Sequence, residues 1–399
     1  MLHLLKIEDH VKNFRPQILL LSGLPCTRPA LVYVANSITR GAGLLVCGHV
    51  SGKSVKERGI MSQESYRWLR RRKIRAFYDF VATKSTAEGI RALIQTSGLG
   101  KMRPNIIMMG FLNSWRTCNE STVEEYVGAI HEAFDANLGV IILCIKEGFD
   151  ISNAINFEKL VLENADESRT MESTVDISAV HAAAPLEVRN DITDPILLER
   201  IAAAQRFLPA KKKHMAGHIS IWWLYDDGGL TILIPYLMAQ RGIWSHCPIK
   251  LYCLAGKDPV AAQNEMLSLL AKFRITVQEV IPIDLDTPPS PLSVTWFHDM
   301  IGVLRDREPM PKRKMSGLPV IKDSDLFDFG HRTLRQIRLR ELLLEHSKAD
   351  SCLNVVTMPL PKTSQSSTFF LSVLHSLTDS LPPTLLIRGS QENVLTYYC

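Results

Sequence analysis

Two adjacent acids are the most conspicuous candidates for chemistry in this sequence. Asp226 and Asp227 follow the aromatic and apolar run IWWLY and precede Gly228 and Gly229. A carboxylate pair that binds a metal or assists phosphoryl transfer must converge on one cleft, as in a D-x-D motif. Neighbouring residues of a strand point to opposite faces, so these two carboxylates are not expected to converge. Asp227 followed by two glycines instead predicts a helix N-cap at a strand-to-helix corner.

The segment SGKS at 51–54 follows an apolar run and resembles the end of a phosphate-binding loop. That motif, G-x-x-x-x-G-K-[ST], requires a glycine at position 47 when Gly52 is its second glycine. Residue 47 is Cys47, and the nearest glycine, Gly48, is one position off. The loop would be too short to cradle a phosphate with its backbone amides, so we do not expect a phosphate loop here.

His246, Cys247 and Cys253 could suggest a metal site or a thiol nucleophile. Cys253 lies within an apolar run with no second ligand pair nearby, which favours buried structural thiols. The sequence also lacks a G-x-S-x-G elbow and a GxGxxG after its first apolar run. We therefore predict no catalytic residue, no metal site and no enzymatic activity.

Arginines dominate one helical segment, WLRRRKIR at 68–75. Arg70, Arg71 and Arg72 would cover a wide arc of the helix, which favours a solvated face or a helix C-terminus that complements the helix dipole. Contact with anionic lipid headgroups or an acidic partner is the alternative. The run KKKH at 211–214 allows the same two interpretations.

The composition is that of a globular protein of about two domains. Of 399 residues, 46% are hydrophobic and 22% charged, and the net charge of +5 is too small to argue for a nucleic-acid partner. None of the eight cysteines forms a CxxC, which predicts reduced thiols in a cytosolic protein. No apolar run approaches the ~18–20 residues of a membrane-spanning helix, and the charged start is unlike a signal peptide. As given, the chain is predicted to be soluble.

Short apolar runs alternate with helix-length segments twice along the chain, which predicts an α/β fold of doubly wound, mostly parallel sheets. The expected strands are the runs at 17–22, 43–50, 76–82, 105–111 and 139–145, then 218–226, 247–256, 274–283, 353–360 and 383–389. We predict a first subdomain at 1–150 and a second at 216–399. The polar and acidic stretch between them, 151–215, is expected to be a partly disordered linker with one helix near 195–208.

Ordered blocks along nearly the whole chain resemble the C-terminal cytosolic domain of cation–chloride cotransporters. The most specific are HVKNFRPQ and WWLYDDGGL, and others include GLLVCGHV, GLGKMRPN, KEGFDIS, LLAKFRI, TLRQIRLRELLLEHS and the terminal VLTYYC. The resemblance is greatest to the sodium-coupled branch, which includes the sodium–potassium–chloride cotransporters.

This resemblance implies a fold and a role. The family domain is similar to a pair of universal-stress-protein-like α/β subdomains. It follows a twelve-helix membrane domain, supports homodimerisation and takes part in regulating electroneutral symport of chloride with sodium and often potassium, a transport linked to cell volume. The expected partners are therefore the transmembrane domain, which is absent from this chain, and a second copy. The expected location is the cytosolic side of a membrane, or the cytoplasm for this chain alone.

Relatives in the potassium–chloride branch are associated with a nucleotide in the first subdomain. The matching place here is the strand ends around Ser22, Gly23, Gly48 and Gly110, where open α/β sheets bind ligands. ATP is thus a candidate ligand, although no phosphate loop supports it. The alternative to a transporter domain is a free-standing cytosolic nucleotide-binding regulator of the universal-stress-protein type.

Overall fold

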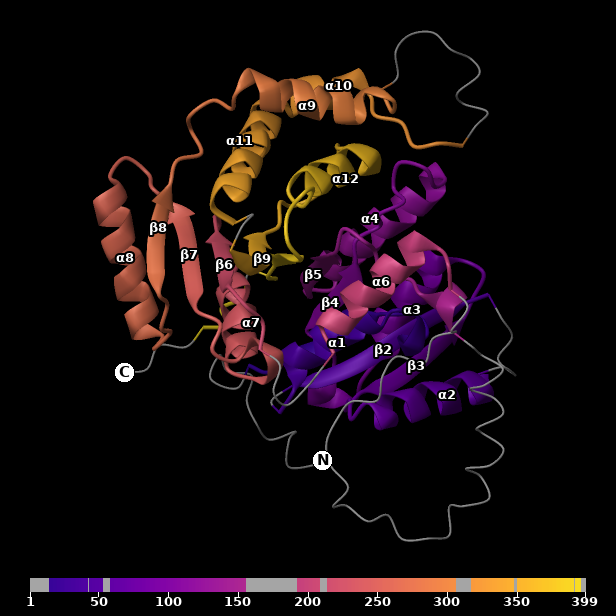
Figure 1. The fold of residues 1–399 in the computed structure, drawn as a ribbon. Coiled ribbons are helices and arrows are strands. Elements are labelled where there is room, and N and C mark those ends of the chain that lie inside the picture. The colour runs from indigo at the N-terminus through magenta and orange to yellow at the C-terminus, as the bar shows by residue number, and fades with distance from the viewer. Residues whose placement is uncertain are drawn as a thin grey trace.

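One continuous β-sheet organises the chain (Figure 1). The computed structural model describes residues 14–41, 43–52, 58–155, 192–208, 214–305, 317–347, 350–390 and 392–395. Within these ranges ten strands form a single sheet in the order β3-β2-β1-β4-β5-β10-β9-β6-β7-β8. The sheet therefore passes from the first half of the chain to the second without a break.

The first half is a strand–helix alternation. Its strands are β1 (Gln17–Leu21), β2 (Leu44–Ser51), β3 (Phe77–Ala82), β4 (Ile106–Gly110) and β5 (Gly139–Cys144), and its helices are α1 (Pro29–Thr39), α2 (Arg58–Arg71), α3 (Thr86–Thr96) and α4 (Glu120–Asp135). Helix α6 (Pro195–Arg206) follows and packs on α1. The strands are nearly continuous apolar runs because both faces of a parallel sheet are covered.

The second half repeats this alternation with extra helices before its fourth strand. Its strands are β6 (His218–Trp223), β7 (Ile249–Leu254), β8 (Glu279–Ile283), β9 (Ser351–Thr357) and β10 (Thr384–Arg388). Its helices are α7 (Leu230–Ala239), α8 (Pro259–Lys272), α9 (Pro291–Gly302), α10 (Asp323–Asp328), α11 (Gly330–Ser347) and α12 (Ser367–Ser376).

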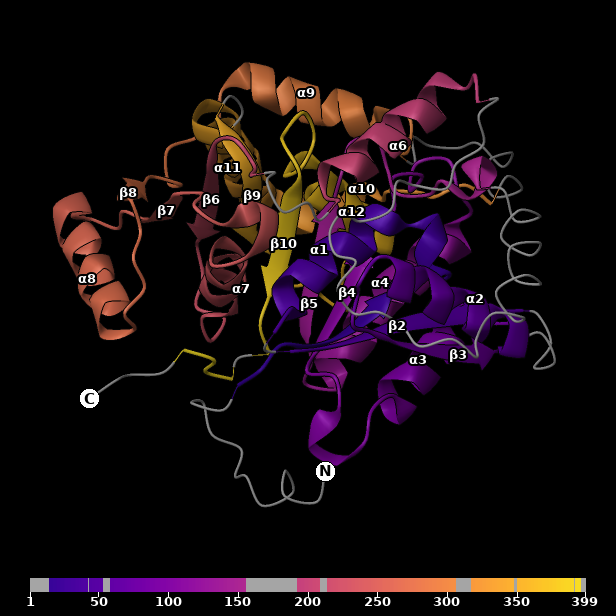
Figure 2. The ribbon, with the colours of Figure 1, turned by 60° about the horizontal axis from the view of Figure 1, so that its bottom comes forward.

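The two halves have the same strand order and meet at equivalent edges. Numbered within its own half, each has the order 3-2-1-4-5, and the fifth strands, β5 and β10, lie side by side (Figure 2). All pairs within a half are parallel, whereas β5 and β10 are antiparallel, with Leu143 opposite Leu385 and Ile141 opposite Ile387. The carboxyl ends of the strands in one half therefore lie on the opposite side of the sheet from the carboxyl ends of the strands in the other half. We call the β5–β10 pairing the seam.

Alternate residues of the central strands enter two separate cores, one on each face of the sheet. On β10, Leu385 and Ile387 belong to the core under α1, α6 and α7, and Leu386 belongs to the core under α4, α11 and α12. This is the period of two expected for strands covered on both sides. The protein is thus a three-layer α/β/α structure.

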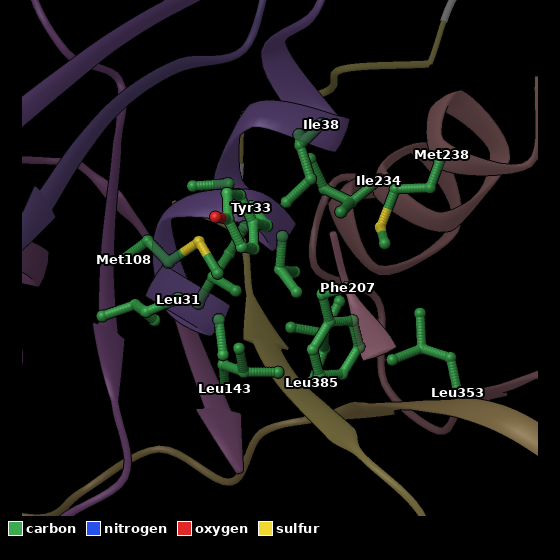
Figure 3. Packing of buried hydrophobic residues seen from close by; sticks show 14 of the residues in the cluster. Leu31, Tyr33, Ile38, Met108, Leu143, Phe207, Ile234, Met238, Leu353 and Leu385 are labelled. Atoms are coloured by element: carbon green, nitrogen blue, oxygen red, sulfur yellow. The ribbon is translucent and has the colours of Figure 1, made fainter. Parts of the chain in front are cut away.

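Equivalent helices of the two halves pack against each other across the seam. Helix α1 contacts α7 on one face, and α4 contacts α12 on the other. Figure 3 shows the first of these contacts, where Tyr33 and Ile38 of α1 and Ile234 and Met238 of α7 lie above Leu385. Because these side chains are all buried, the seam is held by apolar packing as well as by backbone hydrogen bonds.

The α/β fold with mostly parallel strands is confirmed, and all ten expected strands have counterparts in the sheet. Helix α6 spans Pro195–Arg206, where one helix was expected. The boundaries 1–150 and 216–399 stay a prediction, and most of the expected linker, 156–191, lies outside the described residues. In the described part of the chain no helix is long and apolar enough to cross a bilayer.

A substitution that creates a cavity in the seam tests whether the two halves unfold together. We expect Leu385→Ala to lower the free energy of unfolding by about 3 kcal/mol, because Leu385 is fully buried and its truncation leaves a cavity. Chemical denaturation followed by tryptophan fluorescence measures this. Leu292→Ala is the control, since Leu292 is 84% exposed, and should change stability by at most about 0.5 kcal/mol. Two separate unfolding transitions in the unmodified chain would contradict a shared cooperative core.

Candidate functional site

The acidic pair lies at the corner between β6 and α7, and its two carboxylates have different surroundings. Asp227 is fully buried. Its Oδ2 accepts hydrogen bonds from the amide and hydroxyl of Thr231, at 3.1 and 2.7 Å, and from the Gly389 amide at 3.3 Å, while Oδ1 accepts from the Gly229 amide at 3.2 Å. Asp226 is exposed and accepts one bond, from the Gly228 amide at 3.0 Å.

This arrangement confirms a strand-to-helix corner and moves the expected cap. The N-cap position of α7 is Gly229, in a left-handed conformation with φ of 88°, and not Asp227. Asp227 still caps the helix from two residues earlier, because it binds the amide of Thr231 in the first turn. Its bond to Gly389, after β10, ties the corner to the strand that forms the seam.

Close backbone contacts require glycine at Gly228 in the corner and at Gly389 beside it. A Cβ on Gly228 would lie 1.9 Å from the carbonyl oxygen of Glu392, and one on Gly389 would lie 2.0 Å from the carbonyl oxygen of Asp227. The Val394 amide donates to the Gly228 carbonyl at 2.8 Å. The corner is therefore covered by the segment 392–395, which excludes an open catalytic cleft at Asp227.

A cavity of about 500 Å³ lies beside this corner, at the edge where β6, β9 and β10 end. Each of these strands contributes a residue at or just beyond its end, namely Tyr225, Leu360 and Arg388. The remaining wall comes from the start of α11, from α12 and from the loop between β9 and α12. We call this the β6–β9 cavity.

Sequence reasoning missed the β6–β9 cavity because its cations are far apart in the chain. Arg332 and Arg335 lie on α11, Lys362 on the loop after β9, and Arg388 at the end of β10. The available signal was position: Tyr225, Lys362 and Arg388 all lie within a few residues of the carboxyl end of an expected strand, where α/β sheets bind ligands. Which strands are neighbours was needed to join them.

The structure brings together three of the four residues expected around a nucleotide. Ser22 is buried beyond the end of β1, and the Gly23 amide donates to the Gly48 carbonyl at 3.2 Å. Gly48 lies within β2 and not at its end, and a Cβ there would be 2.9 Å from Leu93. Its lack of a side chain is therefore explained by packing under α3.

Gly110, the fourth of these residues, ends β4 and packs beneath an aromatic ring. A Cβ on Gly110 would lie 2.8 Å from the ring of Phe149, and the Gly110 carbonyl accepts a hydrogen bond from the Tyr126 hydroxyl at 3.1 Å. These contacts give Gly110 a structural role, and binding of ATP near Ser22 and Gly23 stays a prediction. In SGKS, Ser51 ends β2, and 53–57 lie outside the described residues.

The three arginines for which lipid contact was the alternative do not share one environment. Arg72 is only 3% exposed, and its guanidinium lies 5.1 Å from the ring centroid of Trp68. Its position within the core is incompatible with contact to a lipid surface. Arg70 is exposed and Arg71 half-buried on the last turn of α2, so lipid contact by these two stays a prediction. Of KKKH, only His214 lies in the described ranges.

The cysteines considered as ligands are buried in strands or beside them. Cys253 lies within β7, and the Sγ atoms of Cys247 and Cys352 are 4.0 Å apart. His246 lies beside His214, with ring centroids 5.6 Å apart. Across the described ranges, no three His, Cys, Asp or Glu side chains are placed to hold a metal ion. The structural interpretation of these thiols therefore has support from their burial.

Removing the buried carboxylate of the corner should destabilise the protein strongly. We expect Asp227→Ala to lower the free energy of unfolding by about 3 kcal/mol, because several buried donors lose their acceptor. Asp226→Ala is the matched control and should cost at most about 1 kcal/mol, since Asp226 is exposed and accepts one bond. Urea denaturation measures both. Equal effects of the two substitutions would contradict the distinct roles assigned to the acids.

Comparison with known proteins places the chain in a family. The family model described as solute carrier family 12 matches residues 28–199 and 190–399. Solute carrier family 12 member 2 of Squalus acanthias is 36% identical over 98% of this chain and 37% of its own length. Member 1 of Rattus norvegicus is 36% identical over 100% of this chain and 39% of its own length, and member 3 of Pseudopleuronectes americanus is 37% identical over 99% and 38%.

The chain is also similar to a solved structure, the cytoplasmic domain of a prokaryotic cation chloride cotransporter. The match covers 96% of this chain and 98% of that chain, with 12% identity and a TM-score of 0.46. This likeness is too distant to carry a functional conclusion. The three relatives are 36–37% identical to this chain over 98–100% of its residues, although the chain spans only 37–39% of their length. On the family match and these relatives, the chain belongs to solute carrier family 12.

Proposed function

We propose that this chain is the cytosolic regulatory and dimerisation part of an electroneutral sodium-coupled chloride symporter, which in some relatives also carries potassium. The observation that supports this most is the distribution of the match. Nearly all of this chain is matched, yet it spans only 37–39% of each relative. Transport would then depend on the larger share of the relatives that lies outside the matched region.

The sodium-coupled branch is proposed on the residues of two segments. HVKNFRPQ and WWLYDDGGL resemble that branch most closely, and WWLYDDGGL runs from the end of β6 through the corner to the first residue of α7. The buried position of Asp227 and the close contacts of Gly228 give this segment a structural role at the corner. The assignment to the sodium-coupled branch therefore rests on the resemblance of these two segments and not on a residue that contacts an ion.

A surface on α9 and α10 is suited to the proposed dimer contact. Leu292 at the start of α9 is 84% exposed, Val303 just beyond its end is 73% exposed, and Phe327 on α10 is 89% exposed. These helices form an outer layer over α11 and α12 (Figure 1). Large apolar side chains that are this exposed favour a contact with another protein.

Transport in a chimaera tests the proposed role. The matched region of the Squalus acanthias relative would be replaced by this chain, and sodium-dependent chloride uptake measured in cells. We expect uptake of at least half that of the intact relative, because the chain would supply the missing domain. The relative with the region deleted is the lower reference, and the same chimaera carrying Leu385→Ala tests the need for an intact seam.

A chimaera that reaches the cell surface in normal amounts but takes up no more chloride than the deleted relative would overturn the proposed role. Surface biotinylation supplies the amount. Equal uptake by the deleted relative and the intact relative would also overturn it, since the domain would then contribute nothing to transport.

Sedimentation of the purified chain tests dimerisation separately. We expect a concentration-dependent monomer–dimer equilibrium that Phe327→Asp weakens at least tenfold, because a charge would be placed in an apolar contact. Val260→Asp is the matched control, since Val260 is 65% exposed on α8, away from α9 and α10. A strictly monomeric chain at high concentration, or equal weakening by both variants, would contradict dimerisation through this surface.

A further inference from the structure

The β6–β9 cavity lies at a position where open α/β sheets bind ligands. In the second half of the sheet, the chain adds β7 and β8 on one side of β6 and then β9 and β10 on its other side. Crossover helices therefore leave to opposite faces on the two sides of this point, which opens a crevice beyond the carboxyl ends of the strands. Tyr225 beyond β6 and Leu360 beyond β9 line the cavity at this crevice.

Arg388 is a buried cation in the wall of this cavity. It is only 9% exposed, and no described residue accepts a hydrogen bond from its buried Nε. Burial lowers the pKa of Arg388, an effect that attraction to Asp227, Tyr225 and Asp226 opposes. Asp227 already accepts four hydrogen bonds from other groups, so it does not satisfy the guanidinium. A buried guanidinium with an unused donor favours an anion from outside the chain.

The rest of the wall is also cationic. Arg332, Arg335 and Lys362 line the cavity with Arg388, and no Asp or Glu is among its lining residues in the described ranges. Of the three, Arg335 is 3.6 Å from the carboxylate of Asp286, which is itself 83% exposed. Its Nε is buried without a described acceptor. The nearby acids Asp226, Asp227 and Asp286 lie outside the lining, so a ligand in the cavity would meet four cations and no lining carboxylate, which favours a ligand with two or more negative charges.

The cavity also has an apolar side and the volume of a small-molecule site. Phe329, Phe369, Phe370 and Val373 line it together with the cations. Its volume of about 500 Å³ is within the range of ligand-binding cavities. A ligand that fits both sides carries a charged group and an apolar or aromatic body.

We propose that the β6–β9 cavity binds a small organic phosphate. Its phosphate groups would lie at Arg388, Arg332 and Lys362, and its apolar or aromatic body against Tyr225 and Leu360, which are 37% and 43% exposed. Arginine fits this chemistry because its planar guanidinium binds two phosphate oxygens at once. The site concerns binding alone, so its failure and the failure of the proposed transport role are separately observable.

Calorimetric titration of the purified full chain with ADP, pyrophosphate and inorganic phosphate tests the proposal. We expect one ADP bound per chain, pyrophosphate to bind more weakly than ADP because it lacks the aromatic body, and inorganic phosphate to bind weakest. Arg388→Met should weaken ADP binding at least tenfold, and Arg332→Met at least threefold. Arg332 is exposed, so its variant is expected to fold normally even if Arg388→Met does not.

Two control variants assign the binding to this cavity. Arg103→Met removes one exposed cation from the first half and should leave the affinity within twofold. Ser22→Ala alters the other candidate region, beyond the end of β1 in the first half of the sheet, and should also leave the affinity for ADP within twofold. Loss of ADP binding with Ser22→Ala, but not with Arg388→Met and Arg332→Met, would assign the nucleotide to the first half and overturn the proposal.

Other outcomes are equally decisive. No heat and no thermal shift with any of the three probes at millimolar concentration would overturn the proposal, as would equal weakening by Arg103→Met and Arg388→Met, which would indicate general attraction to a basic surface. Tight binding of a phosphorylated peptide that Arg388→Met abolishes, with ADP inert, would replace the small molecule by a protein segment and overturn the proposed ligand class.

Discussion

The antiparallel pairing of β5 with β10 is the contact on which the rest of the structure depends. It is buried on both faces, because Leu385 and Ile387 enter one core and Leu386 the other. Without it each half would be a five-stranded sheet with an exposed apolar edge strand, which is a template for aggregation. The seam removes both edges at once, and it brings α1 against α7 and α4 against α12. Both cores therefore contain residues from both halves.

The corner at Asp227 shows how the same contact is supported at its end. Asp227 follows β6, yet one of its carboxylate oxygens binds the Gly389 amide after β10. That bond spans the end of β9, which lies between the two strands. A single buried acid thus fixes the start of α7 and the end of the seam strand together. The β6–β9 cavity lies beside this fixed corner, so its wall is built on a rigid part of the sheet.

Much of the fold could be predicted from the sequence, and the reasons differ for the parts that could not. All ten strands were recognisable because strands covered on both faces are continuous apolar runs. The joining of the two halves into one sheet could not be predicted, because a central strand such as β5 has the same apolar composition as an edge strand. The corner was predicted from Asp227, Gly228 and Gly229. The expected cap was two residues too early, because a residue pattern does not show that Gly229 takes the left-handed conformation. The basic residues around Arg72 in the sequence predicted a solvated side chain, but Arg72 is buried against Trp68. The cavity required knowing which strand ends are adjacent.

The seam also has the form of a contact between two subunits. Equivalent strands meet in antiparallel orientation, and equivalent helices meet on each face, as in an isologous dimer with twofold symmetry. Here the two partners belong to one chain, so their association depends on effective concentration and not on dilution. Dilution that separates two copies of the chain would leave this internal pair intact. The chain thus carries an assembled pair within itself. Among the described strands, β3 and β8 are the sheet edges to which another strand could add.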